Sequence, residues 1–236
     1  MKIEEMNWEM VEALVRKEKR AVLPLGSTEQ HCRLSLGTDM ILSRKVSLDA
    51  AEPLEVPVYP VLPYGVTPYF REFPGTVTLK MDTYLKILAD VLDSLYQSGH
   101  RKILIVNGHG GNAFAGGFAQ EWLRSHEDAR IRLHNWWSAP KTWAKVQEVE
   151  KGCSHASWME HFPWTGLDGV AYETQKSKPP LDLEMLRQLP PGEVRRFVGD
   201  GNYGGLEKQA SDSIMEEIWD IAVKETRELL ETGWAD

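Results

Sequence analysis

The chain reads Lys102-Ile-Leu-Ile-Val-Asn-Gly-His-Gly-Gly-Asn112 near its middle, and this stretch predicts the fold class. The run 102–106 is the most apolar short segment of the chain, which is typical of a strand buried on both faces of a parallel sheet. A Gly-rich turn follows it, and the segment 112–126, rich in small residues, is predicted to be a helix. A buried strand that leads through a tight turn into a helix is the repeating unit of an α/β fold.

The alternation of apolar runs and helical periodicity continues on both sides of this stretch. We predict further strands at 21–25 and 131–136, a strand or extended edge segment at 56–62, and a turn feeding a short strand at 74–79. We predict further helices at 8–15, 39–51, 81–97, 140–150 and 211–230, the last capped by Ser211. The stretch 165–205 shows no regular pattern apart from 181–189. We therefore expect a three-layer α/β/α fold with a mostly parallel central sheet, formed as a single domain over residues 1–236.

Composition narrows the class of partner. The 236 residues are 42% hydrophobic and 26% charged, as in ordinary globular proteins, and the net charge of −8 disfavours a nucleic-acid partner. The sequence contains no apolar run long enough to span a membrane and no apolar leader at its start, so no membrane partner is expected. Cys32 and Cys153 are too few for a disulfide framework. We expect a cytoplasmic protein that acts on a small molecule.

Three potential metal ligands follow the first predicted strand. Glu29 and His31 are two residues apart, so an extended backbone directs both to one side, and Asp39 begins the next predicted helix. Any one of them alone is typical of a solvated charge or a helix cap. Together they interrupt an otherwise apolar stretch, where charged groups are costly unless paired or bound to metal. Nitrogen and oxygen donors of this kind suit divalent zinc, manganese or iron.

Reactive and aromatic side chains also follow the next two strands. His109 comes directly after 102–106, and Trp136 and Trp137 stand at the end of 131–136. Because sites in parallel sheets lie beyond the carboxyl ends of the strands, we expect these residues to share one pocket. Gly110 and Gly111 leave backbone N–H groups open toward a developing negative charge. The alternative is that His109 lies in an ordinary Gly-rich turn and has no functional role.

A third polar cluster lies further along the chain. His155 and Glu160 stand in the stretch Cys153-Ser-His-Ala-Ser-Trp-Met-Glu-His161, beside Trp158. Satisfied histidines near the surface would explain it equally well. The tryptophans of this region, Trp158 included, predict either an aromatic-walled pocket or ordinary core packing.

The combination of these motifs resembles the creatininase (creatinine amidohydrolase) family over residues 5–228. The matching stretches are Gly-Ser-Thr-Glu29-Gln-His31, Leu-Gly-Thr-Asp39, Phe-Pro-Gly-Thr76 and Asn-Gly-His109-Gly-Gly-Asn112. The resemblance implies a three-layer α/β fold and a hydrolytic centre of two divalent metal ions, in a homo-oligomer that is often a hexamer. It implies five metal ligands, with Asp39 bridging both ions: Glu29, His31, Asp39, His109 and Glu160.

The chain departs from the family pattern where substrate is bound. The stretch Glu29–Asp39 is one residue shorter than usual and lacks a second histidine. Gly110 and Gly111 replace the tyrosine and glutamate that creatininase carries after the strand-end histidine. These departures predict a substrate other than creatinine.

Four functional hypotheses follow. The first is a metal-dependent hydrolase that opens a small cyclic substrate at an amide C–N bond, using a metal-bridging hydroxide, with His155 or Glu160 as proton donor. The second keeps the metal but hydrolyses a C–C bond of a cyclic diketo-polyol such as 3-dehydro-scyllo-inosose, in inositol breakdown. The third is a non-catalytic small-molecule-binding protein, and the fourth an enzyme with Cys32 or Cys153 as nucleophile. The residues predicted to contact the substrate are Gly110, Trp136, Trp137 and Trp158.

Overall fold

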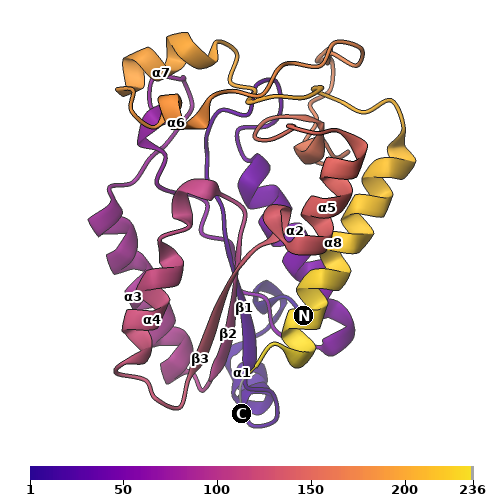
Figure 1. Cartoon of the computed structure of the whole chain (residues 1–236). Coiled ribbons are helices and arrows are strands. Elements are labelled where there is room, and N and C mark those ends of the chain that lie inside the picture. Colours follow the sequence, from indigo (N-terminus) through magenta and orange to yellow (C-terminus); the bar gives the residue numbers. More distant parts are fainter. Residues whose placement is uncertain (235–236) are drawn as a thin grey trace.

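The computed structural model describes residues 1–234, and within them three parallel strands form the central sheet (Figure 1). The strands are β1 (Arg20–Leu25), β2 (Lys102–Asn107) and β3 (Arg130–Asn135), in the order β1-β2-β3. The register places Leu25, Asn107 and Asn135 side by side at the ends of the strands. Three loops therefore leave the sheet at one edge, and their side chains can meet there.

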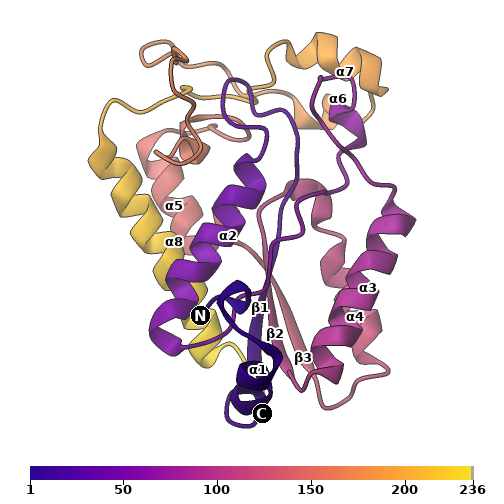
Figure 2. The same cartoon turned by 180° about the vertical axis from the view of Figure 1, so that it is seen from behind.

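Helices cover both faces of the sheet, which confirms the predicted three-layer α/β/α fold (Figure 2). Successive side chains of a strand point to opposite faces. Ile103 and Ile105 of β2 accordingly pack on the side of α3 (Met81–Gln97) and α4 (Ala115–Leu123). The alternate residues of β2, Leu104 and Val106, pack into the opposite core. That core is formed by the helices α2 (Thr38–Ala51), α5 (Pro140–Val149) and α8 (Asp212–Thr232).

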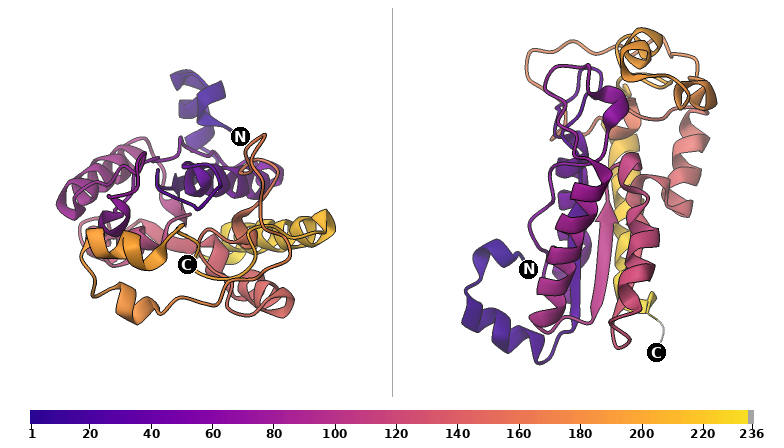
Figure 3. Two further views of the ribbon diagram at one scale, coloured as in Figure 1. Left: turned by 90° about the horizontal axis from the view of Figure 1, so that it is seen from above. Right: turned by 90° about the vertical axis from the view of Figure 1, so that its left-hand side faces the viewer.

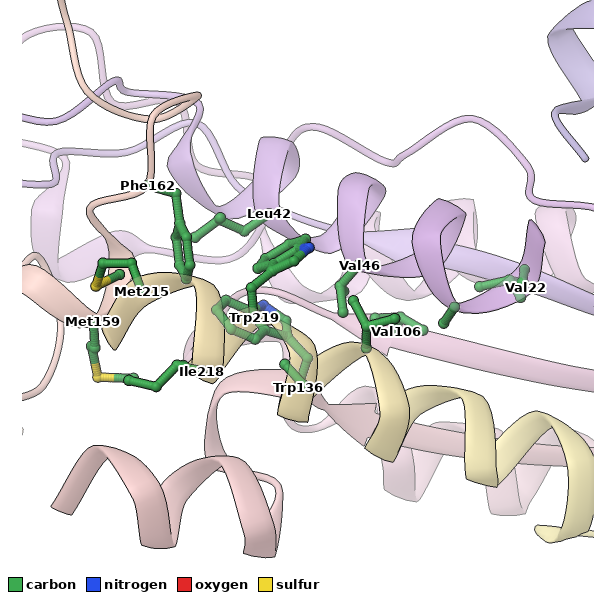
Figure 4. Packing of buried hydrophobic residues seen from close by; sticks show 14 of the residues in the cluster. Val22, Leu42, Val46, Val106, Trp136, Met159, Phe162, Met215, Ile218 and Trp219 are labelled. Atoms are coloured by element: carbon green, nitrogen blue, oxygen red, sulfur yellow. The ribbon is translucent and has the colours of Figure 1, made fainter. Parts of the chain in front are cut away.

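The larger core joins α2 to α8 (Figure 4). Leu42 and Val46 lie one helical turn apart on α2 and pack in the same buried cluster as Trp219 of α8. The indole Nε1 of Trp219 donates a 2.8 Å hydrogen bond to Asp49 of α2, so the buried ring keeps a partner for its polar atom. This packing fixes the first turn of α2, which carries Asp39.

Two prolines explain why segment 56–62 does not add a fourth strand to the sheet. Segment 56–62 runs beside β1 as the predicted extended edge, but it forms only isolated bridges at Val58 and Leu62. Pro57 and Pro60 lack the N–H that a continuous ladder needs. The strand predicted within 74–79 is wrong, because its two bridges pair with different segments, one antiparallel and one parallel, and build no ladder.

Several helix boundaries differ from prediction. A 3₁₀ turn (Gly110–Asn112) precedes α4, which is therefore shorter than predicted. Residues 181–189 contain only the short α6 (Leu183–Leu186). The helix α7 (Pro191–Val198) was not predicted; it begins at a proline, whose missing N–H costs nothing at a first helical position. The predicted cap of α8 is wrong in its bonding, because the Ser211 hydroxyl contacts Ser213 Oγ and caps no backbone N–H.

Two outlying parts frame the molecule (Figure 3). The N-terminal helix α1 (Trp8–Val15) stands away from the sheet, and Asn7 caps it by accepting a hydrogen bond from the Met10 backbone N–H. The helices α6 and α7 lie above the carboxyl edge of the sheet. No helix within residues 1–234 has the length and apolar character needed to cross a bilayer.

His134 of β3 makes folding sensitive to acid. It is buried, its Nε2 lies 3.0 Å from Thr226 Oγ1 of α8, and burial lowers its pKa from 6.5 to about 4. Above pH 6.5 the ring is neutral in both the folded and the unfolded chain. As the pH falls from 6.5 toward 4, only the unfolded chain takes up the proton, so the free energy of unfolding decreases. The decrease in unfolding free energy over this pH range is about 3 kcal/mol.

We therefore expect His134→Gln to flatten the dependence of the unfolding free energy on pH between 6.5 and 4, measured by urea denaturation. The glutamine amide retains a donor for Thr226 Oγ1, so the unfolding free energy near pH 8 should stay close to that of the unmodified protein. An unchanged slope would show that His134 contributes nothing to acid sensitivity.

Candidate metal centre

All five predicted metal ligands meet at the carboxyl edge of the sheet. Glu29 and His31 lie on the loop after β1, Asp39 in the first turn of α2, and His109 directly after β2. Glu160 comes from a 3₁₀ turn (Trp158–Glu160) far along the chain. Each of these side chains is buried, with at most 6% of the residue exposed. The side chains offer donor atoms in two groups, Glu29–Asp39–His109 and His31–Asp39–Glu160, with all the donors of a group within 4.8 Å of one another.

Asp39 belongs to both groups because its two carboxylate oxygens face different histidines. Oδ1 lies 2.9 Å from His31 Nε2, and Oδ2 lies 3.1 Å from His109 Nδ1. The Ser27 hydroxyl also donates a hydrogen bond of 2.7 Å to Oδ2, which holds the carboxylate in place. One carboxylate with an oxygen directed into each group is the arrangement expected of a bridging ligand.

The backbone orients both histidines. His31 Nδ1 lies 3.1 Å from the carbonyl oxygen of Glu29, and His109 Nε2 lies 3.2 Å from that of Val66. A carbonyl only accepts hydrogen bonds, so these nitrogens carry the N–H. The opposite nitrogen of each ring faces the carboxylates, to which it donates when protonated, and it would offer its lone pair to a bound metal ion. Metal-ligating histidines are oriented in the same way.

The charges of the cluster call for cations. Burial alone would lower the histidine pKa values, but the carboxylates outweigh it and raise the pKa of His31 to about 10 and that of His109 well above 6.5. Burial raises the pKa of Glu160 to about 7, whereas the two histidines outweigh burial at Asp39 and lower its pKa. Protons on the histidines thus compensate carboxylate charge, and divalent cations would take over that role when they bind.

An unpartnered oxygen supports the same reading of the cluster. Within the described chain, Glu29 Oε2 is buried and has no hydrogen-bond partner. A buried carboxylate oxygen without a partner is costly, and a metal ion would satisfy it. The donor set and its unsatisfied oxygen therefore fit a pair of divalent ions.

His155 lies beside the predicted ligands. Its Nδ1 is 3.8 Å from Glu29 Oε1, and its Nε2 is 3.2 Å from the carbonyl oxygen of Gln30. The ring stacks on Phe70 with centroids 5.1 Å apart. Burial, reinforced by the charge of His31, lowers the pKa of His155 well below 6.5. The imidazole is therefore neutral at pH 7 and able to accept a proton.

A cavity of about 290 Å³ opens over these groups. Gly110 and Trp137 line it, as predicted for substrate contacts. The structure does not bring Trp136 and Trp158 to the cavity, since both rings are almost fully buried in the core beside α8 (Figure 4 for Trp136). The aromatic residues that do line the cavity are Tyr69, Phe70, Trp137, Trp143 and Tyr203. Of these, Tyr69 and Phe70 lie in a 3₁₀ turn (Pro68–Phe70) and Tyr203 lies in an irregular loop; none of the three was among the residues predicted to contact the substrate.

Neither cysteine has the features of a nucleophile. Burial raises the pKa of both the Cys32 and the Cys153 thiol to about 12, so neither is a thiolate near neutral pH. Among residues 1–234, the side chains that line the central cavity include neither of them.

Comparison with known proteins finds one family that matches nearly the whole chain. The sequence model of the family described as "Creatininase: Creatinine amidohydrolase" matches residues 4–230. The chain is 32% identical over 91 residues to the 3-dehydro-scyllo-inosose hydrolase of Thermotoga maritima, covering 38% of this chain and 29% of that protein. It is 27% identical over 158 residues to the creatinine amidohydrolase of Pseudomonas putida, covering 61% of each. The matches thus span less than two thirds of either relative.

The fold is shared with solved structures over its full length. A mutant creatininase described as "Zn-Zn type" superposes with a TM-score of 0.80 at 23% identity, covering 100% of this chain and 98% of that one.

Proposed function

Because this chain belongs to the creatininase family, we propose that it is a metal-dependent hydrolase that opens a small cyclic substrate at an amide C–N bond. The observation that carries the proposal is the sharing of Asp39 between two groups of buried donors at the carboxyl edge of the sheet. A purely structural role would not require three carboxylates and two histidines to be buried together, because buried charges destabilise a fold unless they are paired or bound to a metal.

The residues divide between two ions. Glu29, Asp39 and His109 would hold one, and His31, Asp39 and Glu160 the other. Such a set of nitrogen and oxygen donors suits zinc, manganese or iron. When bound, a pair of ions supplies Lewis acidity at the substrate carbonyl and a water of lowered pKa. The relative of the "Zn-Zn type" supports a pair rather than a single ion.

The remaining residues handle protons and solvent. His155 is neutral, and its Nδ1 faces the Glu29 carboxylate, so we assign it the proton that passes to the leaving nitrogen. The contact of its Nε2 with the Gln30 carbonyl and the stacking on Phe70 hold the ring in that position. Trp137 and Tyr203 narrow the cavity around a small ring and restrict access of bulk water.

A second candidate reaction uses the same residues. The similarity to the inosose hydrolase of Thermotoga maritima favours hydrolysis of a C–C bond in a cyclic diketo-polyol. That reaction also needs a polarised carbonyl and a proton delivered to the leaving atom, so the metal centre alone does not separate the two candidates. We also propose that the chain acts in the cytoplasm as a homo-oligomer.

One screen tests both reactions. The zinc- or manganese-loaded protein is incubated with cyclic amides and cyclic keto-polyols, and products are identified by mass as the substrate plus one water. We expect turnover of one class, lost on chelation and recovered when the metal is restored. The Cys153→Ala variant should retain activity. Binding of ligands without turnover by the fully loaded protein would instead support a non-catalytic binding protein.

A further inference from the structure

A single cationic side chain faces the candidate metal centre across the cavity. Arg187 follows the last turn of α6 and lines the same cavity as Glu29, Asp39 and Glu160. Among the described residues that line this cavity, it is the one lysine or arginine. Any negatively charged part of a substrate would therefore find its favourable partner there.

Arg187 also lies at the junction with an outer cavity. This second cavity has a volume of about 480 Å³ and shares five lining residues with the first: Tyr69, Gly110, Leu183, Arg187 and Tyr203. Its other lining residues are mostly apolar, Leu186 and Leu189 among them, and within residues 1–234 Arg187 is again the one charged side chain. Arg187 thus lies between the two adjoining cavities.

The guanidinium is left without a protein partner. Across the described part of the chain, no carboxylate lies within 4.0 Å of Arg187, and its side chain makes no hydrogen bond. Most other arginines are engaged, for example Arg101 with Asp128 and Arg195 with the carbonyl of Glu72; Arg196 of α7 also has no partner within the described residues, but it lines neither cavity. A guanidinium presents a planar fork of donors that matches a carboxylate in two parallel hydrogen bonds.

The net charge around the cavity favours a ligand with one negative charge. Three carboxylates carry three negative charges against the four positive charges of two divalent ions, and a hydroxide formed from the water of lowered pKa would balance the fourth, which leaves Arg187 as the unmatched positive charge. A phosphate dianion is usually held by several cationic or N–H donors, whereas one guanidinium suffices for a carboxylate.

We propose that the substrate is an anion whose carboxylate pairs with Arg187 while its scissile carbonyl lies at the metal centre. The position of the carbonyl rests on the proposed function. Recognition of the carboxylate by Arg187 can be measured by binding alone, without turnover.

Calorimetry with matched ring pairs tests this recognition. Zinc-loaded protein is titrated with dihydroorotate and with dihydrouracil, which share a ring and differ by one carboxylate, and with hydantoin-5-acetate and hydantoin. The carboxylate member of at least one pair should bind about tenfold more tightly, the size expected for a partly exposed ion pair with bidentate geometry. Arg187→Gln should abolish that preference, and Arg187→Lys should retain part of it.

The matched control is Arg196→Gln, which alters another arginine, on α7, that lines neither cavity. It should leave the preference unchanged. A preference that survives in Arg187→Gln would show that another group binds the carboxylate and would overturn the proposal, as would equal affinity within every pair. Turnover in the same samples keeps the two proposals separate. Hydrolysis without preference supports the hydrolase alone, and preference without hydrolysis supports Arg187 recognition alone.

Discussion

Asp39→Asn is expected to reduce the bound metal from two ions per chain to one or none and to abolish turnover. Asp39 is the one residue that both donor groups share, and an amide presents a single weak acceptor where the carboxylate presents two charged oxygens. The loss of activity should exceed the roughly 100-fold typical when an outer-shell partner of a metal site is removed. Metal content by mass spectrometry and turnover of the substrate found in the screen are the two measurements.

The fold should survive this substitution. Without the Asp39 charge, His31 and His109 lose a partner that raises their pKa values, so they can be buried as neutral rings. Asp49→Asn is the matched control, because it makes the same change on the same helix, where an amide oxygen can still accept from Trp219 Nε1. Two ions retained in Asp39→Asn would contradict the bridging role.

Gly111→Ala is expected to weaken metal binding by roughly 10- to 100-fold, as loss of an outer-shell hydrogen bond does elsewhere. A Cβ at Gly111 would lie 2.1 Å from the carbonyl oxygen of Val66 and 2.4 Å from His109 Nε2. These are the two atoms whose contact orients the His109 ring. The side chain would therefore push the imidazole out of the direction in which Nδ1 faces Asp39.

The neighbouring glycine provides the control. A Cβ at Gly110 would meet no described atom within 4 Å, so Gly110→Ala should bind metal as the unmodified protein does. Affinities are measured by competition with a chromophoric chelator, which requires no substrate. Equal affinities in Gly110→Ala and Gly111→Ala would show that the orientation of His109 is unimportant for the site.

The convergence of the candidate metal ligands could be predicted because most of them follow predicted strands. Glu29, His31 and His109 directly follow apolar runs, and a parallel sheet brings the ends of such runs together. Glu160 was assigned from its place in a family motif, since nothing in its local pattern shows that a 3₁₀ turn carries it back to His31.

The cavity wall could be predicted only in part. Trp136 and Trp137 are adjacent, and the sequence does not show which of them turns toward the core once β3 ends; the structure buries Trp136 and leaves Trp137 at the cavity. Arg187 and Tyr203 were missed because 165–205 is mostly irregular and its short helices, α6 and α7, carry little periodicity. Long-range packing places these segments over the sheet edge.

The most direct measurement is an anomalous difference map from crystals of the zinc- or manganese-loaded protein, collected at the absorption edge of the metal. We expect two peaks per chain, one among Glu29, Asp39 and His109 and one among His31, Asp39 and Glu160. A map with no peak at these residues, or with metal only elsewhere on the chain, would contradict this expectation.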